Sequence, residues 1–537
     1  MHRNHFARSA ATSLLLSLGF LSSASLGQVS IATYHNDNSR TGQNLQETTL
    51  TTANVNKTSF GRLFYYPVKG YVYAQPLYLQ SVTIPGKGVH NVVFVATEQD
   101  MVYAFDADSN AGSNATPLWV ANFTNPAKGI TAVSSTQIGC SDLVPVIGIT
   151  STPVIDTTTN TIYVLAKTKE KGQFIQRLHA LDVTTGAEKF GGPKVIQAQV
   201  KGSGDGGTTV TFDPGTQAQR PGLLLQNGQV VIGWASHCDN GSYHGWIMAY
   251  DAHTLAQVGV WNATPNGVEG GVWQSGGGLA GDANFNTYFA TGNGTFDVGP
   301  NGGGGVDYGD SIVKLAPPSG GSFTVADYFT PFDQASLDID DIDLGSGGVM
   351  LLPDQPAGSP HLHLLAQSGK EGTLYLVNRD SMGKYNPNSN DSQIVQNIPG
   401  ANGGMWSSPA WWNNTLYIGG QFDNLKAFSF DVTTGKFNPS PISATATSYG
   451  FPPATPSISA NGNSNAILWA IQTEGYSLRR PEILHAYDAT NLAKELFNST
   501  QGSGNGAGGA VKFAVPTIAN GKVYVGAVGR LNVYGLR

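Results

Sequence analysis

A short strand-and-turn pattern recurs along almost the whole chain of 537 residues. Its clearest copy is Leu178–Gly186 (LHALDVTTG), an alternating apolar strand followed by an Asp and a small polar turn that ends in Gly. Other copies occupy Val102–Asp108, Ile247–Leu255, Thr373–Asp380, Leu425–Gly435, Leu484–Asn491 and Leu531–Gly535. Alternation with a period of two is typical of a β-strand with one buried face, and the Asp carboxylate can accept hydrogen bonds from the amides that follow it. One such unit cannot bury its apolar face alone, so the recurrence predicts sheets arranged around a ring, which is a β-propeller.

The spacing of the copies divides the chain into eight blades of four strands. The first seven are expected at Val72–Phe123, Gly148–Ile196, Arg220–Asn262, Gly271–Phe329, Gly347–Ile398, Ser407–Ser443 and Thr455–Asn498. Only three strands remain after them, in Lys512–Arg537, and Phe60–Val68 is a strand with no neighbours in sequence. We therefore expect Phe60–Val68 to complete the eighth blade, because a ring closed in this way leaves no long strand edge exposed. The predicted fold class is all-β, an eight-bladed β-propeller of four-stranded blades closed by an N-terminal strand, with a seven-bladed ring as the alternative.

Composition supports this architecture and argues against several kinds of partner. Charged residues make up 12% of the chain, and the 68 glycines suit short strands joined by many tight turns. The formal net charge of −7 comes without a basic stripe, so we expect neither a nucleic acid nor an anionic membrane as a partner. The sequence contains no H-E-x-x-H motif, no G-x-S-x-G elbow and no Walker loop. Metalloprotease, serine hydrolase and nucleotide-binding functions therefore have no support.

The N-terminus has the three parts of a secretory signal peptide. Arg3 and Arg8 precede the apolar stretch Ala10–Phe20, and the small residues Ser22–Gly27 follow it. This stretch is too short to span a bilayer, and no other segment of the sequence is long and apolar enough to do so. We expect a signal peptide at residues 1–27, an N-terminal extension at 28–57 and a single propeller domain at 58–537. The mature protein is expected to be secreted or periplasmic, soluble and monomeric.

The chain has two cysteines, Cys140 and Cys238, which precede or end neighbouring blades. Both are expected at the same mouth of the ring, and export would place them in an oxidising compartment. We predict a disulfide between Cys140 and Cys238. Two unpaired buried thiols are the alternative.

In a propeller, residues that act on ligands sit on loops at one mouth of the central channel, near the starts of the innermost strands. Unusual polar and aromatic residues fall at such positions here: Cys140-Ser141-Asp142, His237-Cys238-Asp239, Trp273-Gln274, Asn293, Asp338–Asp343 (DIDDID), Lys370-Glu371 and Met405-Trp406. Taken singly, each has an ordinary explanation, because a Trp can pack between blades, an Asn can shape a turn and an acidic run is usually solvated. Their joint occurrence in chain order is what such separate explanations do not predict.

Two of these segments resemble the pyrroloquinoline quinone (PQQ) repeat proteins, the superfamily of the quinoprotein alcohol dehydrogenases. Gly271–Asn293 resembles the family segment in which a Trp forms the floor under the quinone and an Asn binds calcium, which implies these roles for Trp273 and Asn293. Ser368–Gly383 (SGKEGTLYLVNRDSMG) is similar to a family motif whose first Lys or Arg contacts the quinone, which implies that role for Lys370.

Three further segments resemble the family with departures. His237–Ala249 is similar to the segment in which a Glu ligates calcium, and Asp239 is its nearest carboxylate. Thr330–Asp343 resembles the segment with the catalytic Asp, and an insertion leaves three candidates, Asp338, Asp341 and Asp343. Gly139–Gly148 is similar to the place where methanol-type enzymes carry adjacent cysteines and an Arg, but Ser141 and Ile147 stand at two of those positions. Over almost the whole mature chain, the sequence resembles a group of secreted PQQ-repeat proteins.

The resemblance implies PQQ and Ca²⁺ as cofactors and an alcohol or a sugar as the substrate. Such an enzyme needs a flat aromatic group under the cofactor, a hard cation at a quinone oxygen and a carboxylate that takes the alcohol proton. Calcium prefers oxygen ligands, which Asp239, Asn293 and the aspartate run could supply. The alternatives are a cofactor-free propeller that binds a protein or a glycan at its mouth and a scaffold stabilised by calcium. The quinoprotein hypothesis predicts that Asp239, Trp273, Asn293, Lys370 and the aspartate run converge on one end of the channel.

Overall fold

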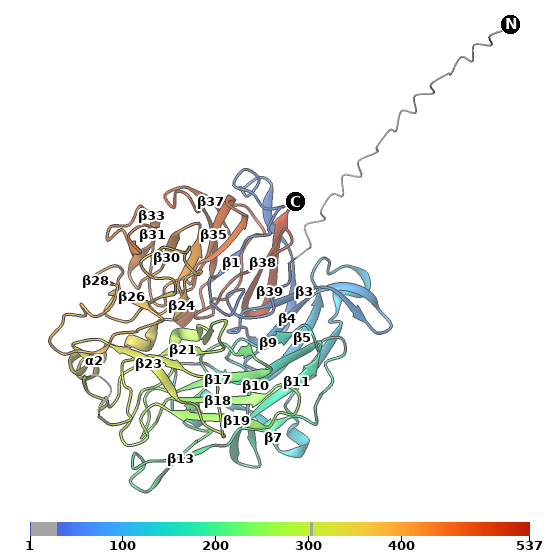
Figure 1. Ribbon diagram of the computed structural model, residues 1–537. Helices are drawn as coiled ribbons and strands as arrows, with labels where there is room; N and C mark the ends of the chain where they lie inside the picture. The colour runs from blue at the N-terminus through green and yellow to red at the C-terminus, as the bar shows by residue number, and fades with distance from the viewer. Residues whose placement is uncertain (2–28, 301–303) are drawn as a thin grey trace.

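Eight β-sheets follow one another around a ring in the computed structural model, which describes residue 1, residues 29–300 and residues 304–537 (Figure 1). Following the colours of Figure 1, the blue N-terminal sheet lies beside the red C-terminal one, so the two ends of the repeat region meet. The predicted eight-bladed propeller is confirmed, and the seven-bladed alternative is not. Apart from Met1, the expected signal peptide lies outside the described residues.

The first four blades each contain four consecutive antiparallel strands. Blade one contains β3 (Leu77–Ile84), β4 (Gly88–Thr97), β5 (Met101–Asp106) and β6 (Trp119–Asn122). Blade two contains β9 (Val154–Asp156), β10 (Thr161–Glu170), β11 (Gln173–Asp182) and β12 (Lys194–Val195). Blade three contains β16 (Leu224–Gln226), β17 (Gln229–Ser236), β18 (Trp246–Asp251) and β19 (Gln257–Asn262), and β15 (Gln217–Ala218) also pairs with β17. Blade four contains β20 (Ala280–Gly281), β21 (Thr287–Ala290), β22 (Ile312–Leu315) and β23 (Val325–Thr330).

The next three blades repeat this order. Blade five contains β24 (Met350–Leu351), β25 (Leu364–Ser368), β26 (Leu374–Asn378) and β28 (Gln396–Ile398). Blade six contains β29 (Ala410–Trp412), β30 (Thr415–Ile418), β31 (Asp423–Asp431) and two short partners of β31, which are β32 (Lys436–Phe437) and β33 (Ser443–Tyr449). Blade seven contains β34 (Ser457–Asn461), β35 (Ser464–Gln472), β36 (Ile483–Asp488) and β37 (Glu495–Asn498).

The eighth blade is closed by the N-terminal strand, as predicted. It contains β38 (Thr517–Ala519), β39 (Lys522–Leu536) and β2 (Phe60–Tyr71), and β2 pairs with the second half of β39 in the register Phe60 to Leu536. The chain of β39 turns back on itself at Gly529, whose φ is 72°. The fold-back brings the carbonyl oxygen of Gly521 within 3.2 Å of the Cβ position of Gly535. The two halves of β39 therefore lie side by side, and with β38 and β2 they make four strands.

Smaller elements lie on the connections. They are β1 (Gln43–Asn44), β7 (Ile130–Ser134), β8 (Val146–Ile147), β13 (Gln199–Lys201), β14 (Thr209–Thr211), β27 (Lys384–Tyr385), α1 (Ser135–Ile138) and α2 (Gln334–Ile339). Short 3-10 turns are η1 (Gly112–Ala115), η2 (Pro126–Lys128), η3 (Gln274–Gly276), η5 (Leu344–Ser346) and η6 (Tyr476–Leu478). Within the described part of the chain, no helix is long and apolar enough to cross a membrane.

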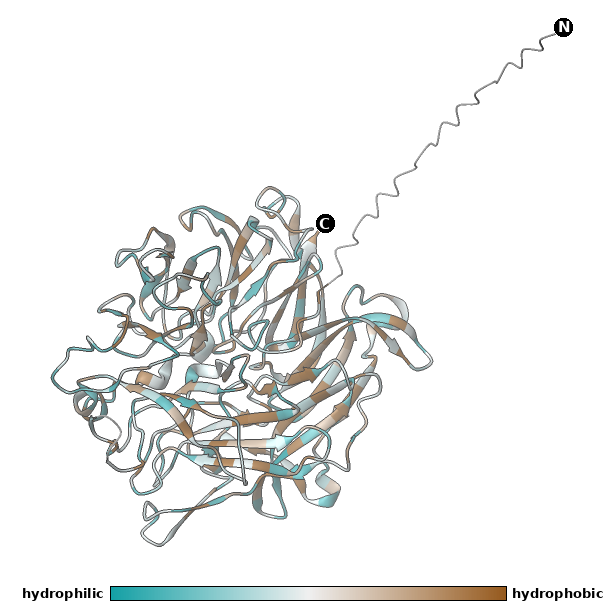
Figure 2. Ribbon diagram, viewed as in Figure 1, coloured by the Kyte–Doolittle hydropathy of each residue, from teal (hydrophilic) through white to brown (hydrophobic). Residues whose placement is uncertain are grey.

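The central strands bury both faces, whereas the sequence pattern suggested one buried face. In β4, Val92 and Phe94 pack with blade two, while the intervening Val93 and Val95 pack with blade eight. Eight apolar clusters of this kind lie between neighbouring blades around the ring. The apolar colouring accordingly follows the strands, and polar colouring is frequent on the loops (Figure 2). Each blade is thus held by its two neighbours, so ring closure completes the core.

The turn chemistry expected from the repeat is present. Asp182 Oδ1 accepts hydrogen bonds from the backbone N–H groups of Thr184 at 2.8 Å and Thr185 at 3.1 Å. Although burial alone would raise it, hydrogen bonds from the hydroxyl and the backbone N–H of Thr184 hold the pKa of Asp182 below its usual value. Asp251 and Asp488 accept equivalent bonds after β18 and β36. The repeated Asp therefore stabilises the end of the third strand of a blade.

The segment Val29–Glu47 fills the centre of the ring and contacts the innermost strand of every blade. Backbone or side-chain hydrogen bonds join it to Tyr78, Ile155, Leu225, Gly281, Leu351, Trp411, Ile458 and Ile518, one residue from each of the eight innermost strands. Within it, β1 pairs in parallel with β34. Although this part of the expected N-terminal extension has no strand periodicity, it is integrated with the propeller.

Candidate functional site

A cavity of about 290 Å³ lies at the end of the channel where the innermost strands begin. Its walls come from the connections that lead into these strands and from the loops after β17 and β25. The residues that line it are Asp142, Arg220, Cys238, Asp239, Trp273, Ser275, Asp343, Ser346, Lys370, Trp406, Phe451, Lys512 and Phe513. Four of the predicted site residues, Asp239, Trp273, Asp343 and Lys370, are therefore on one cavity.

An ion pair between Lys370 and Asp343 lies at the cavity wall. Lys370 Nζ is 2.5 Å from Asp343 Oδ2 and 2.7 Å from Asp341 Oδ1. The backbone also fixes the pair, since the N–H of Lys370 donates to the carbonyl oxygen of Asp343 at 2.9 Å. Asp343 precedes η5, and Lys370 follows β25, so the two residues are held by adjacent connections of blade five. The arrangement presents one buried carboxylate with a fixed cation beside it.

Asn293 links the aspartate run to blade four. Its backbone N–H donates to Asp343 Oδ1 at 2.7 Å, and its Nδ2 donates to Asp341 Oδ1 at 2.8 Å. The next residue, Gly294, donates its N–H to Asp338 Oδ1 at 2.7 Å. All three predicted aspartates therefore contact this turn, but only Asp343 lines the cavity. Asp341 is a rim residue, because its side chain is 75% exposed.

Burial raises the pKa of Asp343, and the Lys370 ammonium and the Asn293 N–H limit that rise. Burial acts in the opposite direction on Lys370, but the two aspartates raise the pKa of Lys370 above its usual value. Asp343 is thus a carboxylate that is paired with a cation and yet holds a proton more readily than an exposed Asp.

Glu269 is a site residue that sequence reasoning missed. Its backbone N–H donates to the Tyr243 carbonyl oxygen at 2.7 Å, and it lies four residues before Trp273 in the sequence. Burial raises the pKa of Glu269, and the charges of Asp338, Asp239, Asp343 and Asp341 raise it further. Glu269 therefore faces the same acidic group. The available signal was a lone Glu before the glycine pair of GVEGGVW, directly ahead of Trp273.

The donor chemistry around Asn293 fits a hard cation. The Asn293 side-chain oxygen Oδ1 is buried and has no hydrogen-bond partner among the described residues. Four aspartate charges act on Glu269, which makes an acidic group of five carboxylates: Asp239, Glu269, Asp338, Asp341 and Asp343. Lys370 forms ion pairs with two of them, Asp341 and Asp343. Calcium is bound by such amide and carboxylate oxygens. The five carboxylates do not form a closed coordination sphere. Among the described residues, only one group of three His, Cys, Asp or Glu residues has ligand atoms within 4.8 Å of one another, and it is Cys140, Asp142 and His237.

Aromatic rings form much of the remaining wall. Tyr243 packs edge-on against Trp273 with ring centroids 6.4 Å apart. Across the lining, Trp406 packs edge-on against Phe451 at 5.5 Å, and Phe451 packs edge-on against Phe513 at 6.3 Å. Rings held in this way present flat apolar surfaces to the cavity, and such surfaces suit a planar aromatic ligand.

Several non-glycine residues with a left-handed φ lie at or near the cavity, and others are distributed along the chain. Those at or near the cavity are Cys238 at 54°, Asp239 at 50°, Glu269 at 69°, Gln274 at 45°, Ser275 at 48°, Asp341 at 55° and Phe513 at 61°. Conformations of this kind cost free energy and persist where the surrounding structure imposes them, often at functional sites.

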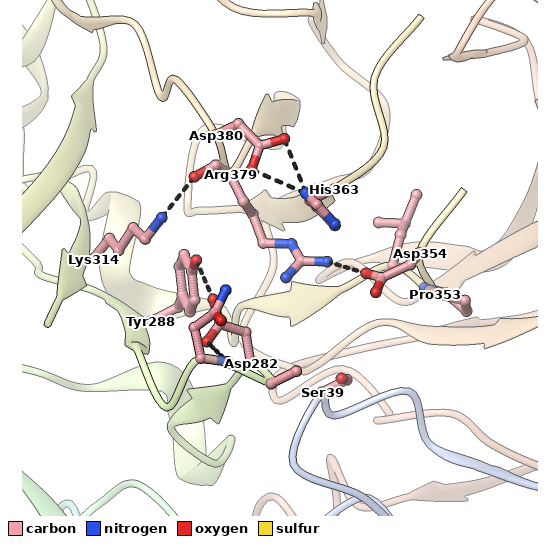
Figure 3. Close-up of a pocket in the computed structure, with 12 residues that line it drawn as sticks. Ser39, Asp282, Tyr288, Lys314, Pro353, Asp354, His363, Arg379 and Asp380 are labelled. Atoms are coloured by element: carbon pink, nitrogen blue, oxygen red, sulfur yellow. Dashed lines mark hydrogen bonds and ion pairs between the residues drawn. The ribbon is translucent and has the colours of Figure 1, made fainter. Parts of the chain in front are cut away.

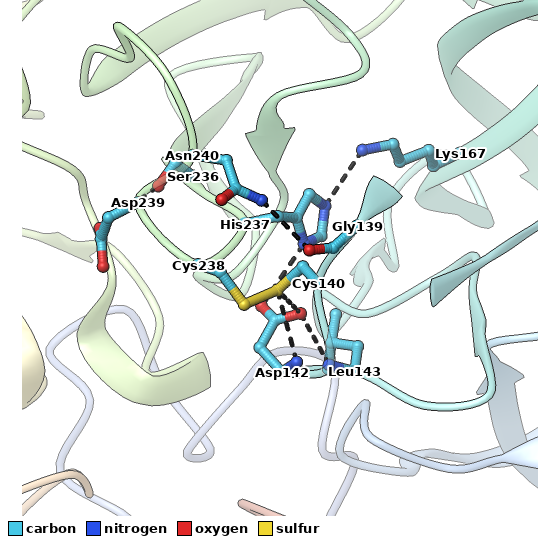
Figure 4. The surroundings of a disulfide bond; sticks show 10 residues. All are labelled: Gly139, Cys140, Asp142, Leu143, Lys167, Ser236, His237, Cys238, Asp239 and Asn240. Carbon is cyan, nitrogen blue, oxygen red and sulfur yellow. Dashed lines mark hydrogen bonds and ion pairs between the residues drawn. A yellow bond between two sulfur atoms is a disulfide. The ribbon is translucent and has the colours of Figure 1, made fainter. Parts of the chain in front are cut away.

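The predicted disulfide between Cys140 and Cys238 is confirmed, with Cα atoms 5.7 Å apart (Figure 4). A polar chain lies beside it: His237 Nδ1 is 3.4 Å from Asp142 Oδ2, and His237 Nε2 is 3.0 Å from Lys167 Nζ. A lysine ammonium only donates, so Nε2 accepts, and Nδ1 carries the proton that is donated to Asp142. Burial and the Lys167 charge lower the pKa of His237 to about 4. Because Cys140 is in the disulfide, this group is a structural cluster and not a metal site. Asp239 points away from it in Figure 4.

A second cavity, of about 250 Å³, lies between blades four and five and contains none of the predicted site residues (Figure 3). Its charged groups pair with one another: Arg379 donates to Asp354 at 2.8 Å, and His363 Nδ1 lies 2.9 Å from Asp380. Tyr288 donates to Asp282 at 2.8 Å. With these groups engaged, the cavity at the channel mouth is the better candidate for chemistry.

No model of a known protein family matches the chain, and no curated protein matches it. Solved structures do match. A quinohemoprotein alcohol dehydrogenase from Pseudomonas putida HK5 is similar over 94% of this chain and 80% of its own, with a TM-score of 0.59 and 14% identity. A europium-containing methanol dehydrogenase is similar over 94% of this chain and 98% of its own, with a TM-score of 0.56 and 13% identity. At these identities the likeness shows the fold alone: the chain has the fold of these two dehydrogenases, as the sequence resemblance implied.

Proposed function

We propose that this protein is a quinoprotein oxidoreductase that binds PQQ and Ca²⁺ at the channel mouth and oxidises an alcohol or a sugar. The observation that carries the proposal is the contact of Asp343 with both Lys370 and Asn293 on a cavity that Trp273 also lines. These are the residue types that the sequence resemblance assigns to the base, the quinone contact, the calcium ligand and the floor. Their convergence from two blades is what the hypothesis required.

When bound, PQQ would supply a planar quinone that accepts a hydride equivalent, and Ca²⁺ would supply a positive charge that polarises a quinone oxygen. Asn293 Oδ1 would ligate the cation together with carboxylates of the surrounding group, among which Asp239, Glu269 and Asp338 have no ion pair with Lys370. The indole of Trp273 would give a flat surface to the ring of the cofactor.

Asp343 is the residue best suited to take the proton of the substrate hydroxyl. It lines the cavity, and burial raises its pKa towards that of an effective base. Lys370 holds the carboxylate in place and compensates its charge after burial. The aromatic wall of Trp406, Phe451 and Phe513 would keep water from the reacting atoms.

The test is reconstitution. The purified protein is incubated with PQQ and Ca²⁺ and desalted, and the retained quinone absorbance is measured. Retention that needs Ca²⁺, followed by alcohol- or sugar-dependent reduction of a dye, is the expected result. Loss of all quinone on desalting, with and without Ca²⁺, would contradict the proposal.

Export from the cytoplasm is part of the same proposal. A disulfide persists in oxidising compartments, so Cys140–Cys238 supports export, and the charged, apolar and small-residue parts of the N-terminus support a signal peptide. The electron acceptor would then be met outside the cytoplasm. N-terminal sequencing of the mature protein, with a start near residue 28 expected, tests this part.

A second candidate function is favoured by the rim of the mouth. Ile339 at the end of α2, Phe422 between β30 and β31, and Leu478 at the end of η6 are 82%, 73% and 66% exposed. Exposed apolar side chains gathered around an opening are typical of a binding surface for a protein. Under this alternative the propeller binds its ligand without a cofactor. It predicts that no quinone is retained and that Phe422→Asp weakens the binding of the protein ligand at the mouth.

A further inference from the structure

Five lysine and arginine side chains are buried among the described residues: Arg40, Lys167, Arg220, Arg379 and Lys512. Three of them are satisfied by protein acceptors. The Nε of Arg40 donates to the Leu279 carbonyl oxygen at 2.8 Å, Lys167 Nζ donates to that of Gly215 at 2.7 Å, and Arg379 donates to Asp354. Burying a cation is costly, so such partners are the rule.

Arg220 and Lys512 depart from this rule. The Nε of Arg220 is buried without a hydrogen-bond partner. Within the described part of the chain, neither the guanidinium of Arg220 nor the ammonium of Lys512 has an acceptor, and neither has a carboxylate within 4.0 Å. Both side chains line the cavity at the channel mouth. The two buried cations without an acceptor in the described part of the chain therefore line the same cavity.

The two cations share one aromatic ring. The Cζ of Arg220 lies 4.8 Å from the ring centroid of Phe513, and Lys512 Nζ lies 5.8 Å from it. Lys512 Nζ also lies 5.1 Å from the ring of Tyr476. Burial and the charge of Arg220 lower the pKa of Lys512 to about 8, because the two positive groups repel each other.

The carboxylates on this side of the cavity are already engaged. Asp142 lines the cavity, but its Oδ1 accepts from the Leu143 N–H at 2.7 Å and its Oδ2 lies 3.4 Å from His237 Nδ1. Glu98 is fully buried behind the wall and accepts from the Gly148 N–H at 2.6 Å. The acidic group around Asn293 pairs with Lys370 on blade five, whereas Arg220 and Lys512 belong to blades three and eight. The cavity thus has an acidic region and a separate basic, aromatic region.

We propose that Arg220, Lys512 and Phe513 form a carboxylate-binding subsite that orients a planar aromatic acid in the mouth cavity. A carboxylate can accept from both head groups while its ring packs on the aromatic wall. PQQ is a planar polycarboxylate, so this subsite deepens the proposed function and, for that ligand, rests on it. The cation at Asn293 and the carboxylate at Arg220 would then fix the two ends of the ligand.

The test uses quenching of tryptophan fluorescence, because Trp273 and Trp406 line the cavity. The full-length mature protein is titrated with PQQ plus Ca²⁺, with trimesate (a benzene polycarboxylate that has no quinone) and with its uncharged methyl ester.

Arg220→Met and Lys512→Met are compared with Lys426→Met, a matched control whose lysine pairs with Asp423 at 2.7 Å outside the cavity lining. Each subsite variant is expected to bind trimesate and PQQ about tenfold more weakly or worse, the loss of one charge-assisted hydrogen bond. The control is expected to match the wild type, and the ester to bind weakly to all proteins.

Two further readouts do not depend on cofactor loading. An amine-reactive reagent, with the products located by mass spectrometry, should label Lys512 in a trimesate-protected manner. The urea midpoint of Arg220→Met should be no lower than that of the wild type, because the variant removes an unpartnered buried charge. A much lower midpoint would show that the guanidinium has protein partners and would overturn the subsite.

The remaining outcomes separate the two proposals. If wild type binds trimesate in an Arg220-dependent manner but retains no PQQ, the subsite stands and the quinoprotein function fails. If PQQ binds to both variants as it does to wild type, the subsite fails and the function stands. If wild type binds neither ligand, the subsite is overturned.

Discussion

The side chain of Asp343 shows how a residue acquires its chemistry from its surroundings. The chain offers a run of four aspartates between 338 and 343, and all of them have the same intrinsic acidity. Packing against Lys370 and Asn293 buries Asp343, while Asp341, two residues earlier, stays 75% exposed. The first therefore suits the proposed role of base in the cavity, and the second is suited to position Lys370.

We expect Asp343→Asn to abolish turnover, with a loss of at least about a hundredfold, because removal of a positioned base costs roughly that factor or more. Retention of PQQ on desalting should persist, since the amide keeps an oxygen for the Asn293 N–H. Asp340→Asn is the control, as Asp340 is exposed in the same run. Dye reduction by the reconstituted variants measures the effect, and an active Asp343→Asn enzyme would exclude Asp343 as the base.

Glu98 provides a second prediction at this scale. Burial raises its pKa from 4.5 to about 7, against the opposing hydrogen bonds from Gly148 and Thr150. Between these two pH values the native state binds more protons than the unfolded state, so the free energy of unfolding falls as the pH rises through this window. The shift corresponds to about 3 kcal/mol at most.

Glu98→Gln removes this titration and keeps an oxygen for the Gly148 N–H. We expect the variant to gain stability relative to wild type between pH 4.5 and pH 7, by up to about 3 kcal/mol. Urea unfolding at several pH values measures the difference, and Glu474→Gln, at an exposed glutamate, should give none. A difference that does not change with pH would contradict the assignment.

At the residue scale, the sequence predicted several residues of the channel mouth but not all the residues that line it. Asp239, Trp273, Asn293 and Lys370 were found because they lie in recognisable segments, and all four lie at or beside the cavity. Their functional roles stay predictions. Glu269, Arg220 and Lys512 were missed because nothing local to a single Glu, Arg or Lys reveals that packing will bury it. The choice of Asp343 within the aspartate run likewise needed the contacts with blade four.

Among the elements, the blades were predictable and the depth of their burial was not. Alternation in a strand such as Gly88–Thr97 gives the period of two, but Val92 to Ala96 are all buried because each blade packs between two others. The closing strand could be foreseen by counting, since β2 supplies the fourth strand that the C-terminal blade lacks. Element edges moved by a few residues, as β2 extends to Tyr71.

The disulfide joins the connections of two neighbouring blades at the mouth. Its cysteines are 98 residues apart, so the crosslink restricts a long loop of the unfolded chain. In the chain-entropy account this is worth up to about 4.7 kcal/mol. We expect Cys140→Ser/Cys238→Ser to lower the free energy of unfolding by about 2–4 kcal/mol, measured by urea unfolding, and wild type that is unfolded without reductant to show no free thiol. Two titratable thiols in that sample would contradict the pairing.

The whole molecule is organised around its N-terminal segment. Val29–Glu47 has no apolar periodicity, so the sequence gives no reason to place it in the interior. Its partners are mostly backbone groups of the eight innermost strands, and such partners exist together only once the ring has closed. A polar segment can therefore be buried, because the channel supplies acceptors and donors that a single sheet could not. This long-range dependence is why the expected extension could not be read as part of the core.

A substitution of Arg40 tests whether the segment Val29–Glu47 is an integral part of the core. It is fully buried, and its guanidinium donates to the carbonyl oxygens of Leu279 and Leu223, which belong to the inner parts of blades four and three. It also donates to Thr33 Oγ1 at 2.7 Å and to the Tyr34 carbonyl oxygen at 2.8 Å within its own segment. Arg40→Met would leave these buried acceptors without a donor. Each unsatisfied group costs roughly 1–3 kcal/mol, so we expect a loss of about 3 kcal/mol or more in the free energy of unfolding.

The matched control is Arg480→Met, because Arg480 is exposed and lies on the loop after η6. Urea unfolding followed by tryptophan fluorescence should show a clearly lower midpoint for Arg40→Met and an unchanged midpoint for the control. Limited proteolysis should cut the Arg40 variant within residues 29–47 sooner than wild type, because the segment would leave the channel more often. If Arg40→Met unfolds and resists the protease as wild type does, the segment is an appendage, and the ring is held by contacts between blades alone.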